Sequence, residues 1–391
     1  MNRKYNVLIL FLVVIMLCIV GCQSVGTEET AQEISDEEWM FEELKKVVEL
    51  YRGIYEQAII DENTSTLRLK REIIDCLGEK GYSVVDNENL IDMKNSETVE
   101  KFVEKLQREE DAEVTFYQVM ENGGLVRYDL SSIEGKFNAV RSSLVWRDAE
   151  MSLGVYEAFE VKRWHYTKKG YLFLEQYFPE GYDGSPGQIG IRVKPLDENL
   201  RELNQNYVIP IGYGCNNFLI TDWDETDCGA LDFYDLFDIM YRMKYGGPYS
   251  DNGGVEAVEY WIPAGEFEAV IQTYMDVAVE VIREKTFFDE DKMSYRYRPR
   301  TMDDMEMPYG PEPEVVACEE QENGTLKLVV EAVWIREFSD CVVTSELTVR
   351  PMSDGSFRYV SNKVVSMDAK LGCTWRKERL TNEEWETINR N

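Results

Sequence analysis

The stretch Val114-Thr115-Phe116-Tyr117-Gln118-Val119-Met120 decides the fold class, together with the turn Asn122-Gly123-Gly124 and the returning run Leu125–Leu130. Strand-forming residues on both sides of an Asn-Gly turn are typical of a β-hairpin. Before Asp111, by contrast, apolar residues recur every three or four positions, as they do in amphipathic helices. Helices that are followed by hairpin-linked strands predict an α+β fold with antiparallel sheets.

Three helices are expected before the hairpin. Ser35 forms a capping box with Glu38 and begins a first helix of about seven turns. Leu67–Lys80 is predicted as a second helix, and Ser96 can cap a third. The apolar face of each helix is expected to pack on the sheet of its own domain.

Further strands and helices follow the hairpin. The predicted strands are Phe137–Trp146, Val155–Tyr166, Tyr171–Phe178, Val315–Glu319, Leu326–Trp334, Val342–Arg350 and Phe357–Val365. The predicted helices are Asp197–Tyr207, Leu231–Tyr245 and one that opens at Pro263, while Gly181–Gly190 is expected to be a loop.

A chain of 391 residues is longer than one hydrophobic core usually serves, so two domains are expected. Each is predicted to be α+β, with helices packed on an antiparallel, hairpin-connected sheet. The predicted division is a signal peptide at 1–21, an acidic flexible tether at 22–35, an N-terminal domain at 36–180, a linking segment with helices at 181–254, and a C-terminal domain at 255–391.

The N-terminus has the pattern of a bacterial lipoprotein signal. Arg3 and Lys4 precede the apolar run Val7–Val20, and the small residue Gly21 stands directly before Cys22. This run is shorter than the roughly 20 residues that span a bilayer, which favours cleavage before Cys22 and lipidation of its sulfur. We therefore expect a protein that is lipid-anchored to the cell membrane, on its extracytoplasmic face.

The net charge is −32, and it becomes −34 when Arg3 and Lys4 leave with the signal peptide. A charge of this size repels phosphate backbones, so nucleic acid is excluded as a partner. It also repels anionic headgroups, so the lipid on Cys22 is expected to provide the membrane attachment by itself.

Asp222, Asp224 and Asp227 form an acidic segment that suggests a calcium loop, because Ca²⁺ prefers carboxylate oxygens at alternate positions. An EF-hand would need glycine at the sixth position and an acid at the twelfth, where this chain has Asp227 and Phe233. Calcium is the only cofactor that the sequence suggests. The competing interpretation is an exposed loop near a helix N-terminus.

Arg296, Arg298 and Arg300 alternate in sequence, so in a strand their guanidinium groups would project from one face. Such a face would be a candidate binding site for an anionic ligand. The competing interpretation is a set of internal ion pairs with the surrounding acids.

Catalytic motifs are missing from the sequence. His165 is the single histidine, and it lies in a predicted strand where a structural role is the ordinary one. Apart from Cys18 and Cys22 the chain has six cysteines, which are too scattered in sequence for a zinc site. Cys215–Cys228 and Cys318–Cys341 are the two disulfide pairs to test. The competing interpretation is that all six cysteines are separate thiols.

Four stretches give the chain a resemblance to a family of uncharacterised lipoproteins from clostridia-type Gram-positive anaerobes. They are Gly21-Cys22, Tyr166–Phe173, Pro210–Asn217 and Tyr359–Asn362. The resemblance covers nearly the whole mature chain and implies origin and localisation, but no activity and no functional residues. It also argues against disulfides, because such organisms live without oxygen.

The function that we expect is a non-catalytic envelope module that binds an unidentified small ligand or partner protein. One alternative is a carboxylate-dependent hydrolase of glycan or cell wall, since a chain with 74 acidic residues offers many candidate pairs. The other is a structural or assembly lipoprotein.

Overall fold

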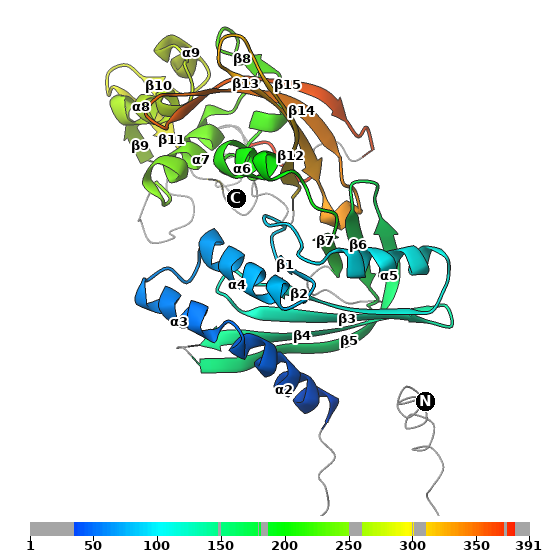
Figure 1. Ribbon diagram of the computed structural model, residues 1–391. Helices are drawn as coiled ribbons and strands as arrows, with labels where there is room; N and C mark the ends of the chain where they lie inside the picture. Colours follow the sequence, from blue (N-terminus) through cyan, green and yellow to red (C-terminus); the bar gives the residue numbers. More distant parts are fainter. Residues whose placement is uncertain are drawn as a thin grey trace, which may run out of the picture. The chain divides into compact units, whose positions relative to one another are not determined.

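The computed structural model describes residues 35–147, 150–178, 180, 187–249, 260–298, 300, 310–370 and 374–379. The predicted α+β class is confirmed, with helices packed on three largely antiparallel sheets (Figure 1). The signal peptide, Cys22 and the tether up to residue 34 lie outside the described residues. No helix in the described ranges is long and apolar enough to cross a membrane.

The first expected helix is two helices, α2 (Asp36–Glu49) and α3 (Arg52–Ile60). The capping box is present, since the Ser35 amide donates to Glu38 Oε2 at 3.0 Å and the Glu38 amide to Ser35 Oγ at 3.3 Å. The single long helix was wrong because the chain turns at Tyr51. That side chain is completely buried, and its hydroxyl donates to the Gly123 carbonyl at 3.0 Å.

A seven-stranded sheet follows in chain order, β1-β2-β3-β4-β5-β6-β7. Its strands are β1 (Val84–Asp86), β2 (Ala112–Val119), β3 (Leu125–Ile133), β4 (Lys136–Arg147), β5 (Glu150–Tyr166), β6 (Tyr171–Gln176) and β7 (Gln188–Arg192). The central hairpin is β2–β3, as predicted, whereas β1 pairs with β2 in parallel. Strand β7 lies partly inside the segment expected to be a loop, and it completes the edge by pairing with β6.

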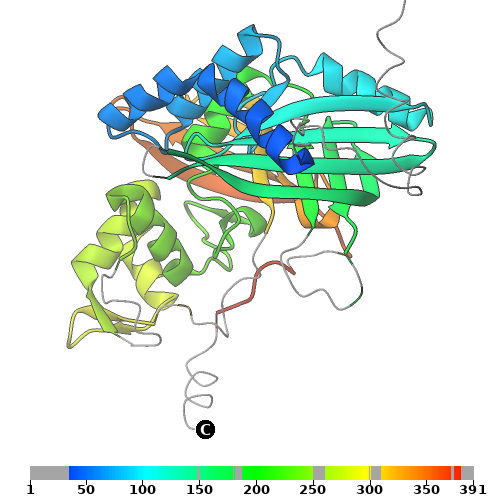
Figure 2. The same cartoon turned by 90° about the horizontal axis from the view of Figure 1, so that it is seen from below.

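Helices cover both faces of this sheet. Leu44 and Val48 of α2 share a core with α4 (Leu67–Glu79) and with Leu144 of β4. On the other face α5 (Glu97–Gln107) packs Phe102 and its neighbours against β2–β7. In Figure 2 the dark blue helix α2 crosses the strands. Both faces of the sheet are thus partly closed by helices.

The predicted linker contributes to the C-terminal core. It contains α6 (Glu198–Leu203), the π-helical turn η1 (Asn204–Val208), the 3-10 turn η2 (Phe218–Ile220), β8 (Trp223–Asp224) and α7 (Phe233–Tyr245). Phe218, Phe233 and Phe237 are completely or almost completely buried in a core that extends to Trp375. The domain boundaries themselves remain predictions.

Two more sheets carry the rest of the chain. The three-stranded sheet β10-β11-β9 consists of β9 (Tyr260–Pro263), β10 (Phe288–Asp289) and β11 (Ser294–Tyr297), with helices α8 (Ala264–Tyr274) and α9 (Val279–Glu284). The five-stranded sheet β12-β13-β14-β15-β8 consists of β12 (Glu312–Glu320), β13 (Leu326–Val333), β14 (Val343–Pro351) and β15 (Phe357–Met367) with β8; the 3-10 turn η3 (Ile335–Glu337) follows β13.

A buried ion pair joins the seven-stranded sheet to β12. Arg192 on β7 and Glu314 on β12 are each 4 % exposed in their side chains, and Nε lies 2.7 Å from Oε2. The Tyr171 hydroxyl donates to the same carboxylate at 2.6 Å. Because both charges are buried, removal of either side chain would leave the other as an uncompensated charge in the interior.

Candidate functional site

The acidic segment around β8 holds its carboxylates apart. Asp224 Oδ1 accepts hydrogen bonds from the Thr226 hydroxyl and amide and from the Asp227 amide, at 2.6, 2.7 and 2.9 Å. These bonds, the Thr226 hydroxyl first, lower the pKa of Asp224. Asp227 accepts from the Gly229 amide, and Asp222 accepts from the Val364 amide on β15. Each carboxylate therefore closes a turn or fixes a strand.

Among the described residues no group of three or more His, Cys, Asp or Glu side chains is placed to hold a metal ion. The calcium hypothesis for Asp222, Asp224 and Asp227 thus gains no support and stays a prediction.

The arginine triplet is divided between two environments. Strand β11 ends at Tyr297, so the alternation that would align three guanidinium groups stops before Arg298. Arg296 lies on the outer face of β11, directly opposite Trp261 of β9. Arg300 turns inward and binds Asp235 of α7 through two bonds, of 2.9 and 2.6 Å. The internal ion-pair interpretation therefore describes Arg300.

Arg300 belongs to a cluster of six charges, which we name the Asp–Arg cluster. Its members are Asp232, Asp235, Asp238, Arg300, Arg376 and Arg379. The three acids stand three residues apart and so share one face of the helix. Asp232 is also the N-cap of α7, accepting from the amides of Tyr234 and Asp235 at 3.0 and 3.1 Å.

Asp235 is the centre of this cluster. Its side chain is 0 % exposed, and besides Arg300 it binds Arg379 at 2.6 Å and Arg376 at 3.0 Å. Burial acts to raise the pKa of Asp235, but the Arg300 hydrogen bonds and the charges of the three arginines outweigh it and lower the pKa. Asp235 is therefore ionised at neutral pH and balances three guanidinium groups together with Asp232 and Asp238.

Asp238 behaves in the opposite way. Burial, which exceeds the opposing effect of Arg379, raises its pKa to about 6. Tyr297 donates its hydroxyl to Asp238 Oδ1. Burial also raises the pKa of Asp232, which lies close to Asp235. The edge of the cluster is thus more easily protonated than its centre.

The outer face of β9–β11 carries a group of half-buried and exposed aromatic and cationic side chains, which we name the aromatic face: Trp261, Phe287, Lys292 and Arg296. The Trp261 and Phe287 rings lie 6.1 Å apart. Lys292 Nζ lies 3.5 Å from the centre of the Trp261 ring, and Arg296 lies 5.4 Å from that of Phe287. Phe287 is 45 % exposed. The opposite face of β11 is core, where Tyr295 stacks on Phe267.

A second set of charges meets where β12 begins. Lys70 of α4 is 3 % exposed and pairs with Asp86, at 3.5 Å, and with Glu88. Glu312 is an exposed residue, yet the protein around its carboxyl, together with the charges of Glu88 and Asp86, raises its pKa to about 7. A carboxyl whose pKa is raised by the surrounding protein and by neighbouring acids is a pattern found in acid–base sites.

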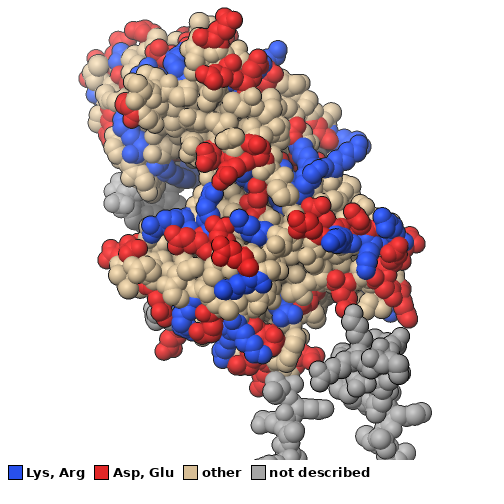
Figure 3. Space-filling view, in the orientation of Figure 1, with Lys and Arg blue, Asp and Glu red and all other residues tan. Residues whose placement is uncertain are grey.

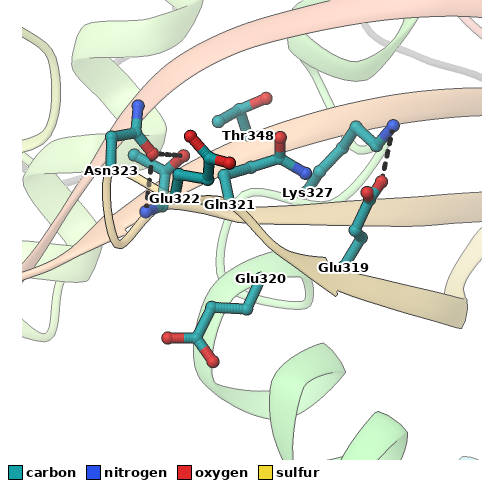
Figure 4. A pocket seen from close by; sticks show the side chains of 8 residues that line it. Glu319, Glu320, Gln321, Glu322, Asn323, Lys327 and Thr348 are labelled. Atoms are coloured by element: carbon teal, nitrogen blue, oxygen red, sulfur yellow. Dashed lines mark hydrogen bonds and ion pairs between the residues drawn. The ribbon is translucent and has the colours of Figure 1, made fainter.

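The remaining candidates lie apart from these groups. His165 is exposed on β5. Cys228, Cys318 and Cys341 are free thiols, so neither Cys215–Cys228 nor Cys318–Cys341 is a disulfide in this structure. An open hollow of about 630 Å³ lies along the β12–β13 hairpin, where Glu319 pairs with Lys327 and Glu320 points away (Figure 4).

Charged side chains of both signs are intermingled on the face seen in Figure 3. Surface charge therefore does not mark a site on this face. The geometry of particular side chains has to identify the candidates.

Sequence reasoning missed Asp235, Arg376 and Arg379. The available signals were the spacing Asp232-x-x-Asp235-x-x-Asp238 at the start of a predicted helix and the pair Arg376-x-x-Arg379 near the C-terminus. Neither spacing predicts that the aspartates pair with the arginines, because the two segments are separated by more than 130 residues in the sequence.

Residues 37–379 match a protein family that is described as a family of unknown function (DUF6070). No curated protein and no solved structure matches the chain.

Proposed function

Since the chain belongs to this family of unknown function, we propose from its own residues that it is a lipid-anchored extracytoplasmic protein that binds an anionic ligand or partner without catalysis. The proposal places it on the cell membrane of a clostridia-type Gram-positive anaerobe. The anchor rests on Arg3, Lys4, the run Val7–Val20 and Gly21-Cys22. A diacyl group on Cys22 would supply the two chains that stable attachment requires.

The aromatic face is the observation that carries binding. Its two rings and two cations lie on the outer surface of a sheet whose other face is packed core. Exposed aromatic residues beside arginine are the composition of binding hot spots. In a chain of net charge −32, the positive charges of Arg296 and of Lys292, which also pairs with Asp289 at 3.3 Å, support an anionic or electron-rich group at this surface.

Thermal melts with a panel of neutral and anionic glycans, at fixed ionic strength, test the binding site. A ligand of this face should raise the melting temperature of the wild-type protein, and Trp261→Ala should abolish the shift. Tyr177→Ala is the matched control, because Tyr177 is 57 % exposed and follows β6, outside the sheet of β9–β11. A shift that survives Trp261→Ala would place the site elsewhere.

Fractionation of cells tests the anchor separately. Cys22→Ala should move the protein from the membrane to the soluble fraction, since the acidic body repels anionic headgroups. Retention of the Cys22→Ala protein on the membrane would disprove the lipid anchor.

A carboxylate-dependent glycan hydrolase is the second candidate, and Glu312 is the observation that favours it. A general acid needs a pKa near the working pH, which the value of about 7 for Glu312 provides. Glu88 would be the partner carboxylate. Release of reducing sugar from cell-wall glycan should vanish in Glu312→Gln and persist in the exposed control Glu322→Gln; equal rates in both variants would remove this candidate.

A further inference from the structure

The described chain ends with a segment, Thr374–Arg379, that is neither helix nor strand; we name it the strap. Trp375 is 1 % exposed, and its ring packs edge-on against Trp334 at 5.1 Å and Tyr213 at 6.2 Å. The next residue, Arg376, and then Arg379 reach the Asp–Arg cluster. The strap therefore occupies one apolar slot and one acidic site, as a bound peptide would.

The hydrogen bonds that the described residues show for the strap all involve side chains. Arg379 donates to the Arg298 carbonyl at 2.6 Å, and Arg300 donates to the Lys377 carbonyl at 3.0 Å. The indole N–H of Trp375 is buried without an acceptor in the described part of the chain. A buried donor that is left unsatisfied weakens such a contact, so the strap is not held as tightly as its burial suggests.

The site beneath the strap is built for cations. The three carboxylates of α7 face Arg300, Arg376 and Arg379, so the charges balance only while the strap is in place. Without the strap, the described cations left near the three acids would be Arg300, which binds Asp235, and Arg242, which acts on Asp238. A guanidinium group from any chain could then restore the balance.

We propose that the slot of Trp375 and the carboxylates of α7 form a receptor site for the strap, and that this site can take the strap of a second copy of the chain. The strap is the segment seen seated on the site, and every copy carries it. It follows an exposed turn, Asp368–Lys370, at the end of β15. A segment that docks by side chains a few residues after such a turn is the kind of element that identical chains can exchange at low cost. This proposal is independent of the aromatic face.

Complementation between two full-length variants tests the exchange. One variant, Arg376→Gln with Arg379→Gln, keeps the receptor and loses the charges of the strap. The other, Asp232→Asn with Asp238→Asn, keeps the strap and weakens the receptor; asparagine at 232 still caps α7. Mixed after brief warming, the two should form a heterodimer in which the intact strap seats on the intact receptor. Size-exclusion chromatography with mass detection measures it.

The matched control mixes the strap variant with a chain that carries all four substitutions, and it should give no heterodimer. A labelled peptide of residues 374–379 provides a second measurement. The peptide should bind to the strap variant at least ten-fold more tightly than it binds to the receptor variant. Failure of the peptide to discriminate, together with monomers in every mixture, would show that the strap is a fixed part of one chain and would overturn the proposal.

Discussion

Replacement of Asp235 by asparagine should be the most damaging change of a single charge in the C-terminal part of the protein. The carboxylate is 0 % exposed and accepts from three guanidinium groups at 2.6–3.0 Å. The side chains of Arg300, Arg376 and Arg379 are themselves only 7–9 % exposed. The neutral amide of asparagine has the same size as the carboxylate but no charge. The three buried guanidinium groups would then be balanced only by Asp232 and Asp238 at the edge of the cluster.

The expected cost is about 3–5 kcal/mol in the free energy of unfolding, the usual result when one partner of a buried ion pair is removed. The sum of the separate bonds would be larger, but contacts that share one residue do not add. Urea titration followed by circular dichroism measures the loss. Glu322→Gln, at an exposed position of the β12–β13 hairpin, should change the free energy by less than about 0.5 kcal/mol.

The pH dependence follows from the same cluster. Because the pKa of Asp235 is lowered on folding, its stabilisation is complete above the unfolded pKa of about 4 and is lost progressively as the pH falls from there through the lower folded pKa. The wild type should lose its advantage over Asp235→Asn in that range. A cost below about 1 kcal/mol at neutral pH, or one that is constant down to about pH 3, would refute the central role of Asp235.

Three further predictions follow from other described contacts. As the pH rises from about 5 to about 8, the free energy of unfolding of Asp238→Asn should increase by about 1–1.5 kcal/mol relative to that of the wild type. Folding favours the protonated form of Asp238, whose pKa is raised to about 6, and the wild type loses this stabilisation as the pH rises. Parallel melts of the two proteins across that range test the prediction. Glu314→Gln should cost about 3 kcal/mol in urea unfolding, since it leaves Arg192 buried beside a neutral partner; a loss no larger than that of Glu322→Gln would contradict this. Gly123→Ala should lower the melting temperature more than Gly135→Ala, because both have φ near +75° but only at Gly123 would the new methyl meet Tyr55, at 3.1 Å.

Local patterns predicted most of the elements of this fold. The hairpin β2–β3 follows from Asn122-Gly123, and α5 follows from its apolar spacing, because such signals lie within a few neighbouring residues. The break at Tyr51 was not predictable in this way, since it depends on a hydrogen bond to Gly123, 72 residues away. Strand β7 was missed because glycine-rich flanks favour a loop, and only pairing with β6 makes it a strand.

The candidate sites were harder to predict than the fold. The triplet of arginines was visible, but the end of β11 at Tyr297 separates Arg296 from Arg300, and no local pattern shows where a strand ends to within one residue. The group around Asp235 joins three segments that are distant in sequence. Its charges look like any others in an acidic chain until the fold brings them together.

The position of the strap also sets an order of events during synthesis. Asp235 can meet Arg300 once a further 65 residues have been made, but Arg376 and Arg379 follow 141 and 144 residues after it. A chain that appears N-terminus first therefore completes the seven-stranded sheet long before it can neutralise α7. If the protein is exported as we propose, the Asp–Arg cluster can be completed only after Arg376 and Arg379 have crossed the membrane. Until then α7 carries uncompensated acids, and these oppose premature burial of the helix.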